Sequence, residues 1–215
     1  MSISKFTVSF FGVIALLAGC SNSKEAQAID KMKNNPKAGH VRVFNASTGK
    51  VDVKYRNISY GAAESGLATA FKPAGVGTSK ISLIINGTPK EVEAPLKSDI
   101  GTTICVLAGG EIAFIEDEPR YPKGGQNARV LFLDEKMKPV EGATAELVGP
   151  AGKTTFKSAE TMASIAAGDW KGAVGNTNVD PTYFYTIIFT KGKAGWDAHF
   201  LVNSPTDKPV SAGSQ

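Results

Sequence analysis

Residues 115–134 are IEDEPRYPKGGQNARVLFLD, and this stretch decides how the chain is divided. An apolar strand pattern ends at Ile115, gives way to acids, prolines and glycines, and starts again at Ala128. The new pattern, ARVLFLD, matches an earlier phrase, VRVFNAS, that begins at Val41. Prolines and glycines are typical of the segment between two folded units. The sequence therefore predicts a chain that folds twice, with a linker at 119–127.

Both units have the pattern of short strands separated by turns. Val51, Val53 and Tyr55 alternate with polar residues, which is the period of a half-buried strand. The dipeptide Asn-Gly at 86–87 lies between two strand-like runs and predicts a type I′ hairpin. When the two halves are aligned, their predicted strands occur in the same order. In each half, a strand that begins with Arg-Val and an apolar strand that begins with threonine occupy corresponding places. The paired positions are Arg42 with Arg129 and Thr102 with Thr182.

The expected fold class is all-β, with two tandem β-sandwiches of the immunoglobulin or prealbumin-like type. Their predicted boundaries are 40–118 and 128–215. Alternating strands have one apolar face each, so two sheets in each unit can bury those faces together. Only SAETMASIAAG at 158–168 is weakly helical in pattern, and it can equally be a loop.

The N-terminus has the features of an export signal. Lys5 precedes an apolar run from Phe6 to Ala18, which is too short for a bilayer core of about 30 Å but typical of a signal peptide. The run ends in LAGC, which resembles the bacterial lipobox, and predicts a signal peptide over 1–19 and a lipidated Cys20. Residues 20–39 are polar and predict a tether.

The compartment follows from the same resemblance. Ser21 follows the cysteine where retained lipoproteins carry aspartate, which indicates a periplasmic protein anchored to the outer membrane. Without Lys5, the mature chain has 23 basic residues, one fewer than the 24 of the whole chain, against 20 acidic residues. This mild excess, with no basic face interleaved with aromatic residues, argues against nucleic acid as a partner.

Three resemblances concern the architecture and function. HVRVFNAST and EDEPRYPKGGQNARV resemble segments of the AlgF-like accessory proteins of alginate O-acetylation in the periplasm, a likeness that extends over the mature chain. Single units are similar to a secreted bacterial β-sandwich family of unknown function, and VLFLDEKMKPVEGATAELVGPAGK is similar to prealbumin-like domains. All three imply sandwiches. Fold alone does not fix function, and only the first resemblance implies a role in polysaccharide acetylation.

Residues that could support catalysis are few. Cys105 lies in an apolar run, TTICVLAG, and is expected to be a small buried hydrophobe. His40 borders the tether, whereas Asp197 and His199 lie two apart and share one face of a strand. That face is expected to be solvated, with a ligand contact or catalysis as the alternatives. No metal-ligand spacing is recognisable, and no cofactor is expected.

Aromatic and basic residues are the candidates for ligand binding, because sugar rings stack on aromatic faces. Trp170 and Trp196 are expected in the core, whereas Tyr121 in the linker is freer. The candidate residues for an anionic polysaccharide are Arg120, Tyr121, Lys123 and Arg129 around an inter-domain groove, with Asp197 and His199 as further candidates.

The function implied by these observations is that of a noncatalytic adaptor of exopolysaccharide O-acetylation, of the alginate type, in the cell envelope. Its expected partners are periplasmic acetyltransferase components, an anionic polysaccharide, or both, and the membrane through the lipid anchor. The alternatives are a structural or adhesive envelope lipoprotein and, less favoured, an acetyltransferase that uses His199.

Overall fold

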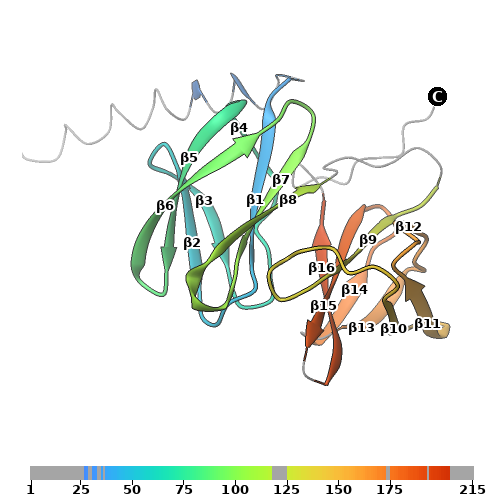
Figure 1. The fold of residues 1–215 in the computed structure, drawn as a ribbon. Coiled ribbons are helices and arrows are strands. Elements are labelled where there is room, and N and C mark those ends of the chain that lie inside the picture. Colours follow the sequence, from blue (N-terminus) through green and yellow to red (C-terminus); the bar gives the residue numbers. More distant parts are fainter. Residues whose placement is uncertain are drawn as a thin grey trace, which may run out of the picture.

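The structure is a computed structural model, and it describes residues 27–28, 31–32, 35, 37–117, 125–172, 175–192 and 194–203. The predicted signal peptide and Cys20 lie outside the described residues, as do Arg120, Tyr121 and Lys123. The described part is all-β and sandwich-like, as the sequence predicts, and its strands form four sheets of four strands. Figure 1 shows the strands of 39–117 in blue to green and those of 128–202 in yellow to red.

The first sandwich consists of two of these sheets. One sheet contains, in spatial order, β4 (Lys72–Ala74), β1 (Gly39–Asn45), β7 (Gly101–Val106) and β8 (Ile112–Asp117). The other contains β3 (Ile58–Ala63), β2 (Val51–Tyr55), β5 (Gly77–Ile85) and β6 (Thr88–Leu96). A single 3₁₀ turn, η1 (Ala108–Gly110), lies between β7 and β8 in this described part.

Turn chemistry explains the hairpin between β5 and β6. Ile85 pairs with Thr88, so the loop has two residues. Asn86 and Gly87 both have positive φ angles, of 49° and 84°, as a type I′ turn requires. The twist of this turn matches that of the two strands, and the predicted hairpin is confirmed.

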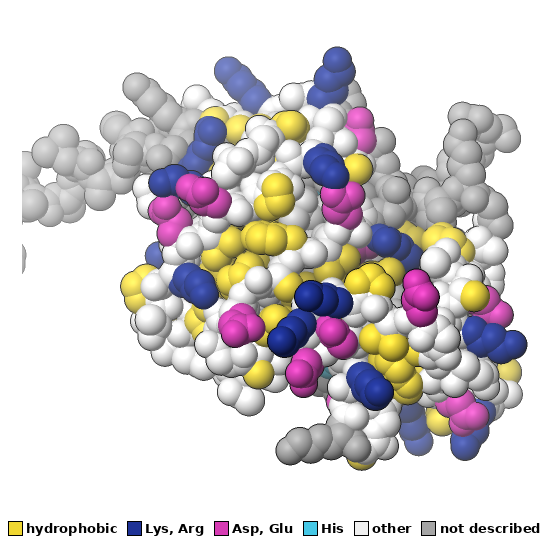
Figure 2. All heavy atoms as spheres, in the orientation of Figure 1, with side chains coloured by type: hydrophobic (Ala, Val, Ile, Leu, Met, Phe, Trp, Pro, Cys, Tyr) yellow, Lys and Arg dark blue, Asp and Glu magenta, His cyan; other side chains and the backbone are white. Residues whose placement is uncertain are grey.

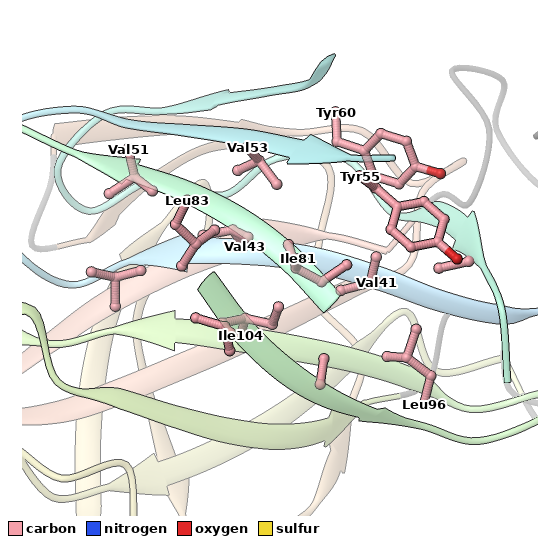
Figure 3. Close-up of a cluster of buried hydrophobic side chains, with 14 residues drawn as sticks. Val41, Val43, Val51, Val53, Tyr55, Tyr60, Ile81, Leu83, Leu96 and Ile104 are labelled. Atoms are coloured by element: carbon pink, nitrogen blue, oxygen red, sulfur yellow. The ribbon is translucent and has the colours of Figure 1, made fainter. Parts of the chain in front are cut away.

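The first sandwich is held together by an apolar layer between its two sheets. The inward residues of each strand alternate with outward ones, as in Val51, Val53 and Tyr55 of β2. Figure 3 shows these side chains together with those of Val43 of β1 and Ile104 of β7. The Tyr60 hydroxyl donates a hydrogen bond of 2.6 Å to the carbonyl of Pro73 and so satisfies its polar end within the core.

The second sandwich repeats this arrangement. One sheet contains β12 (Met162–Ala163), β9 (Ala128–Leu133), β15 (Tyr185–Gly192) and β16 (Gly195–Val202). The other contains β11 (Gly152–Lys157), β10 (Thr144–Gly149), β13 (Gly168–Gly172) and β14 (Gly175–Val179). Its core contains Trp170, which is 3% exposed, and Trp196 packs against that core, as expected for both. Segment 158–168 forms no helix, and its only regular part before Gly168 is β12.

The two sandwiches have the same topology, because each strand of the second corresponds to the strand eight places earlier. In both, the first and seventh strands are parallel neighbours, which pair Arg42 with Thr103 and Arg129 with Thr186. The expected match of Thr102 with Thr182 is wrong, since Thr182 lies in the turn before β15. The Thr-led strands correspond through Thr103 and Thr186 instead.

A third apolar layer lies between the two sandwiches. Phe44, Cys105 and Ile115 of the first sandwich belong to one buried cluster with Ile188 and Leu201 of the second. The sheet of β1, β7 and β8 and the sheet of β9, β15 and β16 are therefore each covered on both faces. This explains why TTICV and the first five residues of β15 are continuously buried rather than alternating.

Candidate functional site

Charged and polar side chains gather at one end of the layer between the sandwiches. Arg42 of β1 and Asp117 at the end of β8 form an ion pair whose side chains are 0% exposed. The Arg42 Nε donates to Thr103 Oγ1 over 2.9 Å, and its guanidinium lies 4.3 Å from the centroid of the Phe71 ring. Its Nη1 crosses to the second sandwich and donates to the carbonyl of Val202 over 3.0 Å.

Asp117 is the centre of this cluster, because it accepts hydrogen bonds from both sandwiches. Thr103 Oγ1 lies 3.2 Å from its Oδ2, and Thr186 Oγ1 donates to its Oδ1 over 2.7 Å. Asn203 Nδ2 and Arg129 Nη1 each lie 3.4 Å from the same Oδ1. One carboxylate thus receives donors from strands at both ends of the sequence.

The energetics of the cluster depend on its being complete. Burial lowers the pKa of the Arg42 guanidinium from its usual value, and the charge of Asp117 opposes that shift. An arginine remains charged in proteins, so the buried positive charge needs its counter-ion and hydrogen-bond acceptors. The cluster therefore resists separation of the two sandwiches, because separation breaks the bonds that cross between them.

Arg129 was predicted to contact a polysaccharide, and the structure places it at the rim of this cluster. Its side chain is 29% exposed, and its Nη1 donates to the carbonyl of Glu116 over 2.8 Å. This nitrogen is engaged within the protein, between β9 and β8. The other predicted residues of that groove, Arg120, Tyr121 and Lys123, lie outside the described residues, so the grouping stays a prediction.

Asp197 and His199 do share one face of β16, but the expectation of a solvated face is wrong for His199. Asp197 is exposed, whereas His199 is half-buried against the first sandwich. Its ring centroid lies 5.1 Å from that of Phe44, and its Nε2 lies 3.2 Å from Thr190 Oγ1. Burial lowers the pKa of His199, while Asp197 and the backbone of Gly66 oppose the shift.

Cys105 also belongs to the layer between the sandwiches. It is 0% exposed, and burial raises the pKa of its thiol to about 12. Because the thiolate is the reactive form, this burial favours the unreactive thiol. The expectation that Cys105 is a small buried hydrophobe agrees with its packing.

The described surface includes a polar hollow and a mainly apolar one. One, of about 570 Å³, lies at an end of the first sandwich and is lined by Ser47, Thr48, Ile85, Asn86, Thr88, Pro89, Lys90, Gly109 and Gly110. Polar groups in it bond to one another, since Lys90 Nζ donates to the carbonyl of Gly110 and Asn86 Nδ2 to that of Thr48. The other, of about 470 Å³, lies along β9 and is mainly apolar.

The outer surface carries charges of both signs. Figure 2 shows basic and acidic side chains interspersed on the face in view. Exposed ion pairs on the first sandwich include Lys50 with Asp52 and Lys80 with Glu91. Pairs of this kind stabilise a fold little, so they are available to charged partners at small cost.

Among the described residues, no cluster of three or more potential metal ligands occurs. In the same part of the chain, no helix has the length and apolarity to cross a membrane. No protein-family model matches the sequence, and no curated protein matches it.

The site residues predicted from the sequence do not include the central residues of the cluster, which are Arg42, Asp117 and Asn203. A charged residue inside an apolar strand was the available signal, because Arg42 and Arg129 each interrupt such a strand one residue before a valine. Asp117 and Asn203 lie at the ends of their own apolar runs and give a weaker signal. The pairing of β1 with β7 and of β9 with β15 brings residues that are far apart in the sequence close together in this cluster.

Proposed function

We propose that this protein is a noncatalytic adaptor in the cell envelope that serves the O-acetylation of an exported anionic polysaccharide. One observation supports the noncatalytic part of the proposal. Cys105 and His199, the residues with the best chemistry for acyl transfer, both pack in the layer between the sandwiches. Covalent acyl transfer needs an accessible nucleophile beside a base, and burial in a packed layer does not favour such access.

The acetylation part of the proposal rests on the resemblance of HVRVFNAST and the 116–130 junction to the AlgF-like accessory proteins. A body of two joined sandwiches suits an adaptor, because the layer and the ion pair between them fix how the exposed faces are presented. Lipidation at Cys20 would hold this body at the periplasmic face of the outer membrane, where an exported polymer passes.

Deletion of the gene tests the proposal. We expect the O-acetyl content of the exported polysaccharide to fall, while polymer yield and chain length stay at the wild-type level, because an adaptor does not build the backbone. Acetate released from purified polymer by mild base, divided by the sugar content, measures this. The control is the deletion strain that carries the wild-type gene on a plasmid. Unchanged acetylation in the deletion strain would refute the adaptor and favour a structural or adhesive lipoprotein.

A further inference from the structure

The contacts between the sandwiches are reciprocal. Arg42 of the first sandwich donates to the carbonyl of Val202 over 3.0 Å, and Arg129 of the second donates to the carbonyl of Glu116 over 2.8 Å. The arginines occupy matching positions, since each pairs with the threonine of its own parallel neighbour strand. The acceptors match too. Glu116 comes directly after the residue of β8 that pairs with Thr103, and Val202 comes directly after the residue of β16 that pairs with Thr186.

The apolar part of the interface has the same correspondence. Phe44 and Leu131 both lie two residues after the matching arginines, and both belong to the layer between the sandwiches. Two further matched pairs belong to it, namely Cys105 with Ile188 and Ile115 with Leu201. Each sandwich thus presents the same patch to the other. Such mutual contact of one patch with its equivalent is the mark of a twofold, isologous interface.

The correspondence is broken at one buried position. Asp117 and Asn203 occupy equivalent positions. Asp117 lies two residues after the residue that pairs with Thr103, and Asn203 lies two residues after the residue that pairs with Thr186. Asn203 Nδ2 lies 3.4 Å from Asp117 Oδ1 and 2.6 Å from Thr186 Oγ1, so the two side chains meet near the centre of the cluster. Among the described residues, this cluster therefore contains the guanidinium groups of Arg42 and Arg129 and the carboxylate of Asp117.

We propose that the face of β1, β7 and β8 is a self-complementary pairing surface whose fitting partner is a second sandwich of this same topology, here the one formed by β9 to β16. Because one sandwich has Asp117 where the other has Asn203, the surface favours pairing between two sandwiches that differ at this position. Two sandwiches with asparagine at this position would leave a buried and a partly buried guanidinium group without a carboxylate, which is costly. A carboxylate at either equivalent position satisfies both arginines.

Exchanging the two side chains in the full chain tests this inference. Asp117→Asn should strongly lower the urea midpoint of unfolding, because buried Arg42 loses its counter-ion. Adding Asn203→Asp should restore more than half of the lost midpoint, since the new carboxylate would lie next to Thr186 and beside the side chain at position 117, which contacts both arginines. The fluorescence of Trp170 and Trp196 reports the transition, as both pack against the second core.

The matched control is Asp117→Asn with Asn178→Asp, which has the same net charge but places the new acid on an exposed residue of β14. It should restore nothing. Equal restoration by both double variants, or none by the Asn203→Asp variant, would overturn the inference. If Asp117→Asn alone does not fold, the yield of soluble folded chain replaces the midpoint, and the same two comparisons decide.

Discussion

Replacement of Arg42 by methionine is expected to destabilise the protein by about 3 kcal/mol, the lower end of the cost of breaking a buried ion pair. Methionine fills much of the volume of the side chain, so the loss reports the missing charge and hydrogen bonds rather than a cavity. Asp117 would keep Thr186 and Arg129 as partners, which is why the cost lies at the lower end. Urea unfolding at neutral pH measures it, and for a chain of this size the melting temperature should fall by roughly 6–12 °C.

The matched control is Arg129→Met, which removes the equivalent arginine of the second sandwich. Its side chain is 29% exposed, whereas that of Arg42 is 0% exposed. We expect a clearly smaller loss for Arg129→Met, because water can replace part of what the guanidinium contacts. Equal losses for the two variants, or no loss for Arg42→Met, would contradict the account of the buried cluster.

Cleavage of the chain between the sandwiches is expected to leave the two parts bound to each other. The Pro-rich and Gly-rich linker predicted at 119–127 would by itself suggest two independent units, but the buried layer of Phe44, Cys105, Ile188 and Leu201 joins them. A protease site inserted within 119–124 allows the cut. After cleavage, both fragments should elute together in gel filtration, because separation exposes this apolar layer and a buried ion pair.

A variant and a control sharpen this test. Leu201→Asp places a charge in the layer between the sandwiches, where Leu201 is 1% exposed, and should make the cut fragments elute separately. Val148→Asp places the same charge on β10, where Val148 is 40% exposed, and should leave them together. Separate elution of the cut wild-type fragments would show that the layer does not hold the units.

Local patterns predicted most of the fold. Alternation in VDVKY gave β2, the Asn-Gly dipeptide gave the turn between β5 and β6, and the two Arg-Val phrases gave β1 and β9. These signals are readable from sequence because each depends on residues a few positions apart. Turn residues and period-two alternation act within single strands and hairpins.

The layer between the sandwiches was harder to predict, since it depends on which sheet faces which. The face of β16 with Asp197 and His199 was correctly identified as a single face, but nothing in GWDAHFLV indicates that Phe44 covers part of it. In the same way, a run such as TTICV is equally apolar whether one sheet or two cover it. The site residues predicted from the sequence therefore include three in the linker, together with Arg129, Asp197 and His199. The buried cluster instead joins residues such as Arg42 and Asp117, which are 75 residues apart.

If the protein supports acetylation without performing it, the acetate content of the polymer should not depend on Cys105 or His199. The deletion strain is given the gene with Cys105→Val and His199→Gln together. Valine preserves the apolar packing, and glutamine keeps polar atoms near Thr190, but neither can act as the thiol or imidazole of an acyl transfer. The denaturation midpoint and the cellular amount of the variant serve as controls for folding. We expect polymer with the wild-type acetate content. Acetate at the level of the deletion strain, from a variant that is folded and present at normal amounts, would instead show that the protein takes part in the acyl transfer.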